Sequence, residues 1–124
     1  MAAELHVELV AADRKVWSGE ATLVVARTTS GDIGVMAGHQ PLLGVLESGP
    51  VTIRTSDGGT VVAAVHGGFI SFADNKMSLL AEIAELSDEI DVQRVERELE
   101  RAKAEGDASA ERRADVRLRA VATR

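Results

Sequence analysis

The period of the hydrophobic pattern changes once along this chain of 124 residues, near Ser87. Before that point, apolar residues alternate with polar ones in short runs separated by Gly and Asp, which is typical of half-buried strands. After it, apolar residues recur every three or four positions, which is typical of an amphipathic helix. The charge density changes at the same place, with 15 charged residues among the first 86 and 19 among the last 38. We therefore predict two domains, at residues 1–86 and 87–124.

The first domain is predicted to be a series of short strands joined by tight turns. Residues 56–59 and 74–75 tolerate positive φ and predict two hairpins, and the glycines at 67–68 predict a bulge or corner between them. No helical run interrupts this pattern, which indicates a mainly β fold, an antiparallel β-sandwich or flattened barrel. Strand-like alternation occupies residues 5–11, 21–27, 51–54, 61–65, 70–72 and 77–81.

The second domain is predicted to be an antiparallel α-helical hairpin. Gly106 is placed to end the first helix, and Asp107 or Ser109 to cap the second. Both apolar stripes are narrow and rich in alanine, so their burial gains only a few multiples of ~0.8 kcal/mol per methylene. Ordering the chain opposes this gain by ~1 to 2 kcal/mol per residue, so we expect a marginal and mobile hairpin. The stripes comprise Val92, Val95, Leu99 and Ala102, and Ala110, Ala114, Leu118 and Val121.

Composition excludes several classes of partner. The net charge is −6 and only Trp17, Phe69 and Phe72 are aromatic, so nucleic acid is not an expected partner. The absence of Cys excludes disulfides, thiolate nucleophiles and sulfur-ligated zinc. The chain opens without a basic region, and no apolar run reaches the ~18 residues that a bilayer span needs. We therefore expect no direct membrane insertion, and attachment to a membrane only through other proteins.

Residues that carry chemistry are few and scattered. His6, His39 and His66 lie in separate segments without the spacing of a metal site. No nucleophile elbow is present, and no glycine loop that cradles phosphate precedes a helix. The sequence therefore predicts a protein that is not an enzyme by itself, with no catalytic or metal site and no required cofactor.

One segment, residues 31–43, has a more specific character. It is predicted to be a short strand followed by a Gly-His-Gln-Pro connection, and the alternative is a loop that caps one end of the sandwich. Its sequence GDIGVMAGHQPLL resembles the signature of the epsilon subunit of bacterial F-type ATP synthases. The resemblance continues through residues 46–53, 66–70, 74–82 and 89–94, in one order over nearly the whole chain. The chain departs from the usual family residues at Ala37, where Pro is common, and at His66, where Ser is common. Neither departure removes a turn glycine.

The resemblance implies a component of the central stalk that couples proton-driven rotation of a membrane ring to ATP synthesis and modulates ATP hydrolysis through its hairpin. It implies as partners the gamma subunit of the stalk, the ring subunits, and the alpha/beta catalytic head when the hairpin is extended. It implies a peripheral protein on the cytoplasmic face of the bacterial plasma membrane. By the same resemblance, Asp32 and His39 contact stalk and ring; the alternative for Asp32 is a role in a turn.

The resemblance also implies ATP as a regulatory ligand of the folded hairpin. The family motif I-D-x-x-R-A is matched from Ile90, except that Val95 replaces Ala and would crowd an adenine. An alternative interpretation makes Asp91 a helix cap and pairs Arg94 with Glu98. The second arm is short, so we expect a weaker brake on rotation than in longer relatives. The residues placed in the nucleotide site are Glu85, Asp91, Arg94 and Arg101.

A different class of function is a free-standing β-sandwich binding module, for a sugar or a peptide, that dimerises through its helices. This alternative explains the predicted fold. It does not explain the continuous match to the family, and three aromatic residues leave little of the stacking surface that a sugar site needs.

Overall fold

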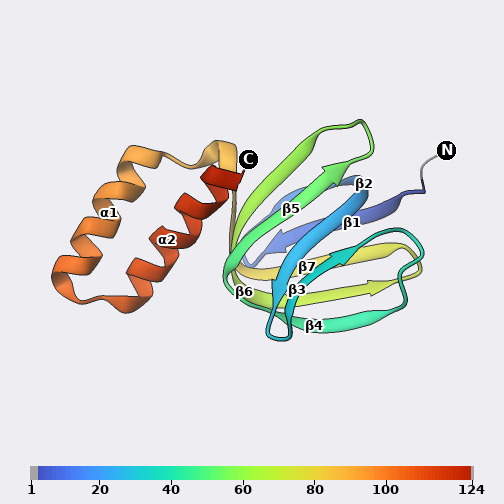
Figure 1. The fold of residues 1–124 in the computed structure, drawn as a ribbon, viewed down its shortest axis with the longest axis horizontal. Helices are drawn as coiled ribbons and strands as arrows, with labels where there is room; N and C mark the ends of the chain where they lie inside the picture. The colour runs from blue at the N-terminus through green and yellow to red at the C-terminus, as the bar shows by residue number, and fades with distance from the viewer. Residues whose placement is uncertain (1–2, 124) are drawn as a thin grey trace.

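The computed structural model describes residues 3–123, which form seven strands, a short 3-10 helix and two α-helices (Figure 1). The helical elements are η1 (Ser87–Glu89), α1 (Val92–Glu105) and α2 (Ala108–Thr123). The strands are β1 (Leu5–Ala11), β2 (Lys15–Thr28), β3 (Gly31–Val35), β4 (Leu42–Leu46), β5 (Gly49–Thr55), β6 (Thr60–Ala73) and β7 (Lys76–Leu86). The predicted fold class, a β-sandwich followed by a helical hairpin, is confirmed.

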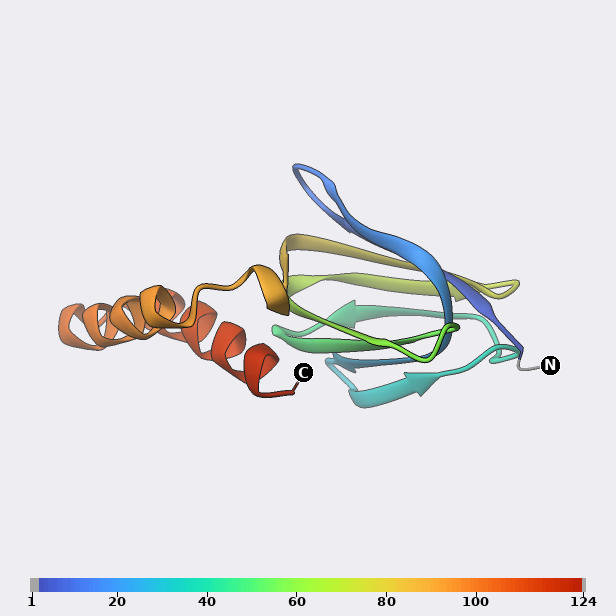
Figure 2. The same ribbon diagram turned by 90° about the horizontal axis from the view of Figure 1, so that it is seen from above.

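The seven strands belong to one hydrogen-bonded sheet that folds over into two layers (Figure 2). The strand order is β1-β7-β6-β4-β2-β3, and β5 pairs with both β2 and β6. β1 pairs with β7 on one side and β2 on the other, which joins the two layers as in a flattened barrel. The pairing of β1 with β7 is parallel, whereas the other pairings are antiparallel.

The longest strands extend beyond their predicted limits. β2 begins at Lys15 rather than near Ala21, because its first residues pair with β1 although none of their side chains is fully buried. β4 has no counterpart among the predicted strands, since its sequence LLGVL is apolar throughout and shows no alternation. β6 joins two predicted strands into one.

The predicted corner lies within β6, at Gly67 and Gly68, which have φ angles of 70° and 136°. Val65 faces the core before the corner and Ile70 faces it afterwards, so the alternation of the strand shifts by one residue there. At this point β6 also changes its partner from β5 to β4. The corner therefore lets one strand serve both layers of the sandwich.

The main core fills the space between the two layers. β1 shows the expected alternation, with every second side chain buried. A smaller second core lies outside the sheet, where Val62 and Ala64 of β6 pack against the hairpin. The largest fully buried side chains are Phe72, Leu5, Leu9, Ile53, Ile70, Met77 and Leu79.

Local capping chemistry defines both helices. Asp91 caps α1, because its Oδ1 accepts the backbone N–H of Arg94 at 3.2 Å. Gly106 ends α1 with a φ of 69°, as predicted. Of the two predicted caps for α2, Asp107 is the one used, and its Oδ1 accepts the backbone N–H of Ala110 at 3.1 Å. Ser109 lies within the helix.

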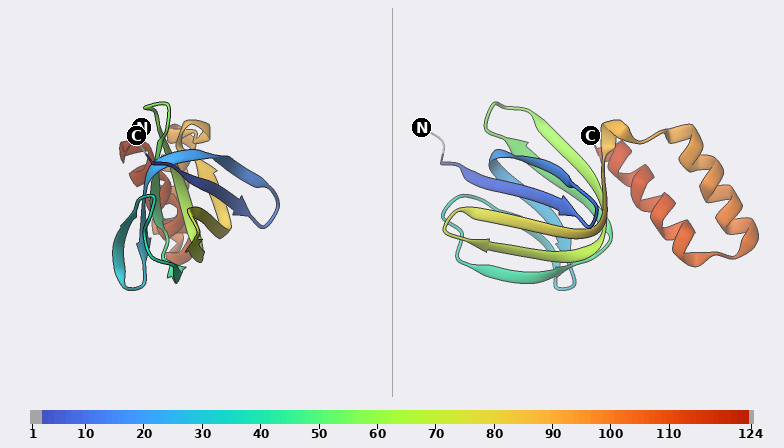
Figure 3. Two further views of the ribbon diagram at one scale, coloured as in Figure 1. Left: turned by 90° about the vertical axis from the view of Figure 1, so that its right-hand side faces the viewer. Right: turned by 180° about the vertical axis from the view of Figure 1, so that it is seen from behind.

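The hairpin packs at one end of the sandwich, away from the end where β1 begins (Figure 3). α1 buries Val95 and Ala102 of its predicted stripe. α2 contacts α1 and also β5 and β6, so it buries side chains on two faces. For that reason α2 buries Val116 and Ala120, which lie outside its predicted stripe. We call this arrangement, with α2 packed on β5 and β6, the docked hairpin. The marginal stability of the hairpin stays a prediction.

Candidate functional site

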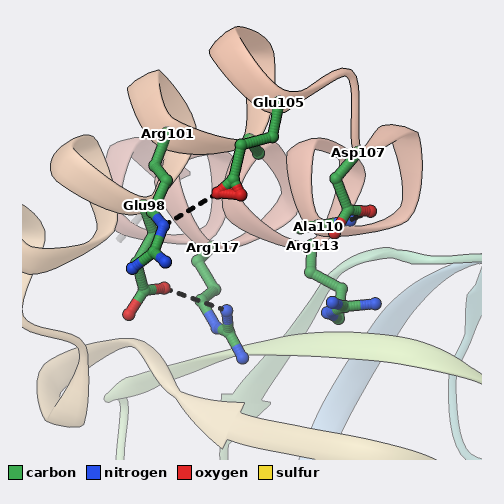
Figure 4. A pocket seen from close by; sticks show the side chains of 8 residues that line it. Glu98, Arg101, Glu105, Asp107, Ala110, Arg113 and Arg117 are labelled. Atoms are coloured by element: carbon green, nitrogen blue, oxygen red, sulfur yellow. Dashed lines mark hydrogen bonds and ion pairs between the residues drawn. The ribbon is translucent and has the colours of Figure 1, made fainter.

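The hairpin meets the sandwich at a cluster of charged side chains from three elements. Arg117 on α2 donates from Nε to Oε1 of Glu85, near the end of β7, at 2.6 Å. Another nitrogen of the same guanidinium lies 3.7 Å from Oε2 of Glu98 on α1 (Figure 4). The Arg117 side chain is 19% exposed. It therefore links the sandwich to both helices from a largely buried position.

His66 on β6 is the third neighbour of Glu85. Its Nε2 lies 3.8 Å from Oε1 of Glu85, too far for a hydrogen bond, so the contact is electrostatic. The His66 side chain is 6% exposed, and neither ring nitrogen has a hydrogen-bond partner among the described residues. His66 foremost, and then Arg117, hold the pKa of Glu85 at about 2, whereas burial of the carboxyl acts in the opposite direction.

The four residues predicted to bind nucleotide lie in one region. Glu85, Asp91 and Arg94 line a cavity of about 180 Å³ between β7 and the hairpin. Arg101 lines a neighbouring cavity of about 300 Å³ between the two helices. Glu98 and Arg117 line both cavities. The fold therefore brings the predicted residues together around two adjoining cavities.

The alternative roles of these residues are also realised. Asp91 is the α1 cap, and Arg94 donates from Nε to Glu98 at 3.0 Å, as the alternative interpretation predicted. Arg101 donates in the same way to Glu105 at 2.9 Å (Figure 4). Both arginine pairs join residues four apart on one helix, and such exposed pairs contribute only ~0.3 to 0.5 kcal/mol each. Their guanidinium groups can therefore be redirected at little energetic cost.

Two further arginines line the larger cavity and were missed by the sequence analysis. Arg113 and Arg117 come from α2 and face the cavity opposite Arg101 (Figure 4). Their spacing of four residues places them on one face of the helix. The signal in the sequence was the basic character of residues 111–124, which carry five arginines and two acids. That signal could not indicate which arginines face the sandwich.

Asp32 and His39 lie at opposite ends of the edge strand β3. Asp32 accepts a hydrogen bond from Nε of Arg27 at 3.0 Å, across the β2–β3 pair. His39 lies in the β3–β4 connection, where its Nδ1 donates to the carbonyl of Gln40 at 2.6 Å and its ring meets the edge of Phe72. Both residues lie at the rim of the sandwich, but they do not form one cluster, and their contact with stalk and ring stays a prediction.

An exposed apolar face covers the outside of β4, β6 and β7. Val45 lies opposite Phe69, and Phe69 lies opposite Leu80, so the three side chains form a row across three strands. Leu43 extends the row along β4 and is 81% exposed. We call Leu43, Val45, Phe69 and Leu80 the outer apolar face. The sequence did not reveal this face, because the alternation of each strand was used to identify only its core-facing residues.

Among residues 3–123 no helix has the length and apolar character to cross a membrane. Within the same residues, no group of three or more His, Asp and Glu side chains is arranged to hold a metal ion. An exposed apolar face of this kind is typical of a protein that contacts neighbouring subunits in a larger assembly.

Comparison with known proteins identifies that assembly. Residues 4–87 match the family model described as the ATP synthase, Delta/Epsilon chain, beta-sandwich domain. The ATP synthase epsilon chain of Streptomyces avermitilis is 92% identical over 124 residues, with all of both chains covered. That of Rhodococcus erythropolis is 48% identical over 120 residues, covering 96% of this chain and 97% of the relative. The chain therefore belongs to the delta/epsilon family of ATP synthase subunits, and within it to the epsilon chains, as the resemblance implied.

Solved structures agree with this fold. A chain of the Euglena gracilis mitochondrial ATP synthase matches with a TM-score of 0.75 at 22% identity, covering 97% of this chain and 78% of that one. A chain of the Tetrahymena thermophila enzyme matches with a TM-score of 0.57 at 18% identity, covering 73% and 68%. The alternative of a free-standing binding module is not favoured, because the relatives that match over all or nearly all of their length are ATP synthase epsilon chains. The chain is a subunit of an enzyme and not itself the catalytic one.

Proposed function

We propose that this epsilon chain is a component of the central stalk that couples rotation of a proton-driven membrane ring to ATP synthesis. The outer apolar face is the observation that carries this proposal. A row of large apolar side chains, with Phe69 57% exposed, is unfavourable in water and is typical of a surface that another protein covers. The gamma subunit of the stalk is the proposed occupant of this face.

Truncation of the face tests this proposal. Phe69→Ser and Leu80→Ser should each weaken binding of the full chain to its gamma-type stalk protein roughly tenfold or more, since loss of a central apolar anchor costs about 2 kcal/mol. Val25→Ser is the matched control, because Val25 is also an exposed apolar side chain but lies on β2. Equal binding of all three variants, measured by titration of the purified partners, contradicts the proposed contact.

The rim of the sandwich at β3 is the proposed contact with the ring. Asp32 and His39 offer a carboxylate and an imidazole at the two ends of an edge strand, and both side chains are exposed. Edge strands of a sheet keep unpaired backbone groups that a neighbouring chain can use. Because the two residues are separated along β3, we propose that they touch different parts of the neighbouring subunits.

The two cavities at the hairpin are the proposed site of regulatory ATP. Arg94 and Arg101 face them from α1, and a guanidinium suits phosphate oxygens because its donors match their geometry. Asp91 and Glu85 offer acceptors beside Arg94. Val95, the departure from the family motif, is buried in the second core and also borders the smaller cavity, so it limits the room for an adenine there.

The hairpin is the proposed regulatory element, and it modulates ATP hydrolysis by leaving the sandwich and extending toward the alpha/beta head. At 1.5 Å per residue, the 16 residues of α2 give a helix of roughly 24 Å. This short reach supports the expectation of a weak brake. The chain itself is proposed to remain peripheral, held on the cytoplasmic face of the bacterial plasma membrane by the stalk and ring. Fractionation tests this location: the chain should leave washed membranes together with the stalk protein.

A further inference from the structure

Among residues 3–123, one ion pair ties α1 or α2 to the strands of the sandwich. Arg14 also lies 3.9 Å from Glu89 of η1, ahead of the hairpin, and that pair is exposed on both sides. Three pairs of the hairpin, those of Arg94, Arg101 and Arg119, join residues four apart within one helix. The pair of Arg117 with Glu98 joins the two helices to each other. Only the pair of Arg117 with Glu85, among residues 3–123, runs from α1 or α2 to a strand.

The Arg117–Glu85 pair is also the least exposed ion pair that the hairpin makes among the described residues. The side chains of Arg117 and Glu85 are 19% and 30% exposed, whereas the pairs within a helix are exposed on both sides. Solvent screens a partly buried pair less, so its attraction persists at physiological salt. Removing one of the two side chains leaves the other charge partly buried and unpaired, which is unfavourable.

Arg117 is the arginine of α2 that donates a hydrogen bond to Glu85. Glu85 also faces the buried imidazole of His66, which borders a cavity shared with Glu82 of β7 and with Arg112 and Arg113 of α2. None of these side chains makes a hydrogen bond with His66, whose ring nitrogens have no partner among the described residues.

Apolar contacts at the same junction are small. The buried residues that α2 and β6 contribute to the second core are all Ala or Val, and Leu118 and Val121 of α2 pack against them while only partly buried. Small side chains remove little apolar area from water, so this contact alone holds the hairpin weakly. The charged pair adds to this apolar contact an interaction that exists only while the hairpin is docked.

We propose that Arg117 and Glu85 form an electrostatic latch that sets the balance between the docked hairpin and the released hairpin. Closing the latch holds α2 on β5 and β6 and, through Glu98, holds α1 on α2. Opening it releases α2 from the strands, while the pairs within each helix are unaffected. The latch acts in the isolated chain and does not depend on the proposed contacts with stalk, ring or nucleotide.

Spin labels on the full chain measure this balance directly. The chain contains no Cys, so Glu47→Cys on the sandwich and Arg97→Cys on α1 give two specific labelling positions, both exposed. The docked hairpin gives a narrow distribution of label distances, and the released hairpin gives a broad one. In this background Arg117→Gln should raise the ratio of released to docked chains at least tenfold. Arg119→Gln is the matched control, an arginine of the same helix whose pair lies within α2, and it should leave the ratio unchanged.

A double-mutant cycle separates the latch from general damage to α2. Glu85→Gln alone should also raise the released fraction, and adding it to Arg117→Gln should change the ratio little further, because the shared interaction is already lost. Amide signals of Val7 and Leu79, which are buried in the sandwich, report that the sandwich itself stays folded. Equal distance distributions in R117Q and R119Q, or fully additive effects of R117Q and E85Q, overturn the proposal.

Discussion

Gly68 lies so close to Leu80 that a Cβ at position 68 would stand 2.0 Å from the Leu80 carbonyl oxygen. This contact, together with the φ of 136°, holds the corner of β6 against β7. Because the obstacle is backbone, no side-chain rotation relieves the collision. The β6 corner and the pairing with β7 therefore depend on glycine at this position.

Gly68→Ala should lower the free energy of unfolding by about 2 kcal/mol or more, since a strained φ and a backbone collision act together. Gly34→Ala is the matched control, because a Cβ there meets only a Leu23 methyl at an ordinary 3.7 Å. Urea denaturation of both variants measures the difference. A loss in G68A no greater than that in G34A would refute the role of the corner.

ATP should bind the full chain through the arginines at the two cavities. Arg94→Gln combined with Arg101→Gln should weaken binding at least tenfold, because each lost guanidinium–phosphate contact contributes about 1.5 to 3 kcal/mol. Arg97→Gln provides the comparison, an α1 arginine that borders neither cavity. Equilibrium dialysis with labelled ATP gives the affinities. Failure of the unmodified chain to bind at millimolar nucleotide would remove the site.

Asp32→Ala with His39→Ala should reduce proton-driven ATP synthesis in membranes while leaving the sandwich folded. The Asp32–Arg27 pair is exposed and contributes only ~0 to 1 kcal/mol to stability, so losing that pair does not unfold the sandwich. Urea denaturation of the double variant checks the contribution of His39, whose ring packs on Phe72. Asp13→Ala removes another exposed carboxylate, in the β1–β2 turn, and should have no effect. Synthesis rates in the double variant that equal those of D13A would argue against contact with the ring.

Stability should depend on Glu85 at low pH. Its pKa is about 2 in the folded chain, below the ordinary 4.5, so ionised Glu85 favours the folded state. The contribution is complete above about pH 4.5 and is lost as pH falls from there toward about 2. The difference in unfolding free energy between the unmodified chain and E85Q should therefore shrink over that interval. Urea titrations at several pH values measure it, and a difference that stays constant would be inconsistent with the assigned interactions.

The sequence predicts well those features that depend only on neighbouring residues, such as helix caps and strand alternation. Asp91 and Gly106 act within a few residues of themselves: Gly106 was predicted to end α1, and the cap was the alternative interpretation of Asp91. The alternation of β1 was equally visible, because one face is buried and the other is solvated. Such signals need no knowledge of the distant parts of the chain.

Contacts between distant segments were not predictable in the same way. Arg117 and Glu85 are 32 residues apart, and nothing local distinguishes Arg117 from the other arginines of α2. The outer apolar face depends on the register of β4, β6 and β7, which places Val45, Phe69 and Leu80 in one row. Register and docking angle are properties of the assembled fold, so these sites emerge only in three dimensions.

The parallel pairing of β1 with β7 has a consequence for synthesis of the chain. β1 is made first, yet one of its two neighbours in the sheet, β7, ends only at Leu86. During translation, β1 must therefore wait with one edge unprotected while more than half of the polypeptide leaves the ribosome. Closure of the sheet is a late, long-range event, which favours slow folding and makes the nascent chain a natural client for chaperones.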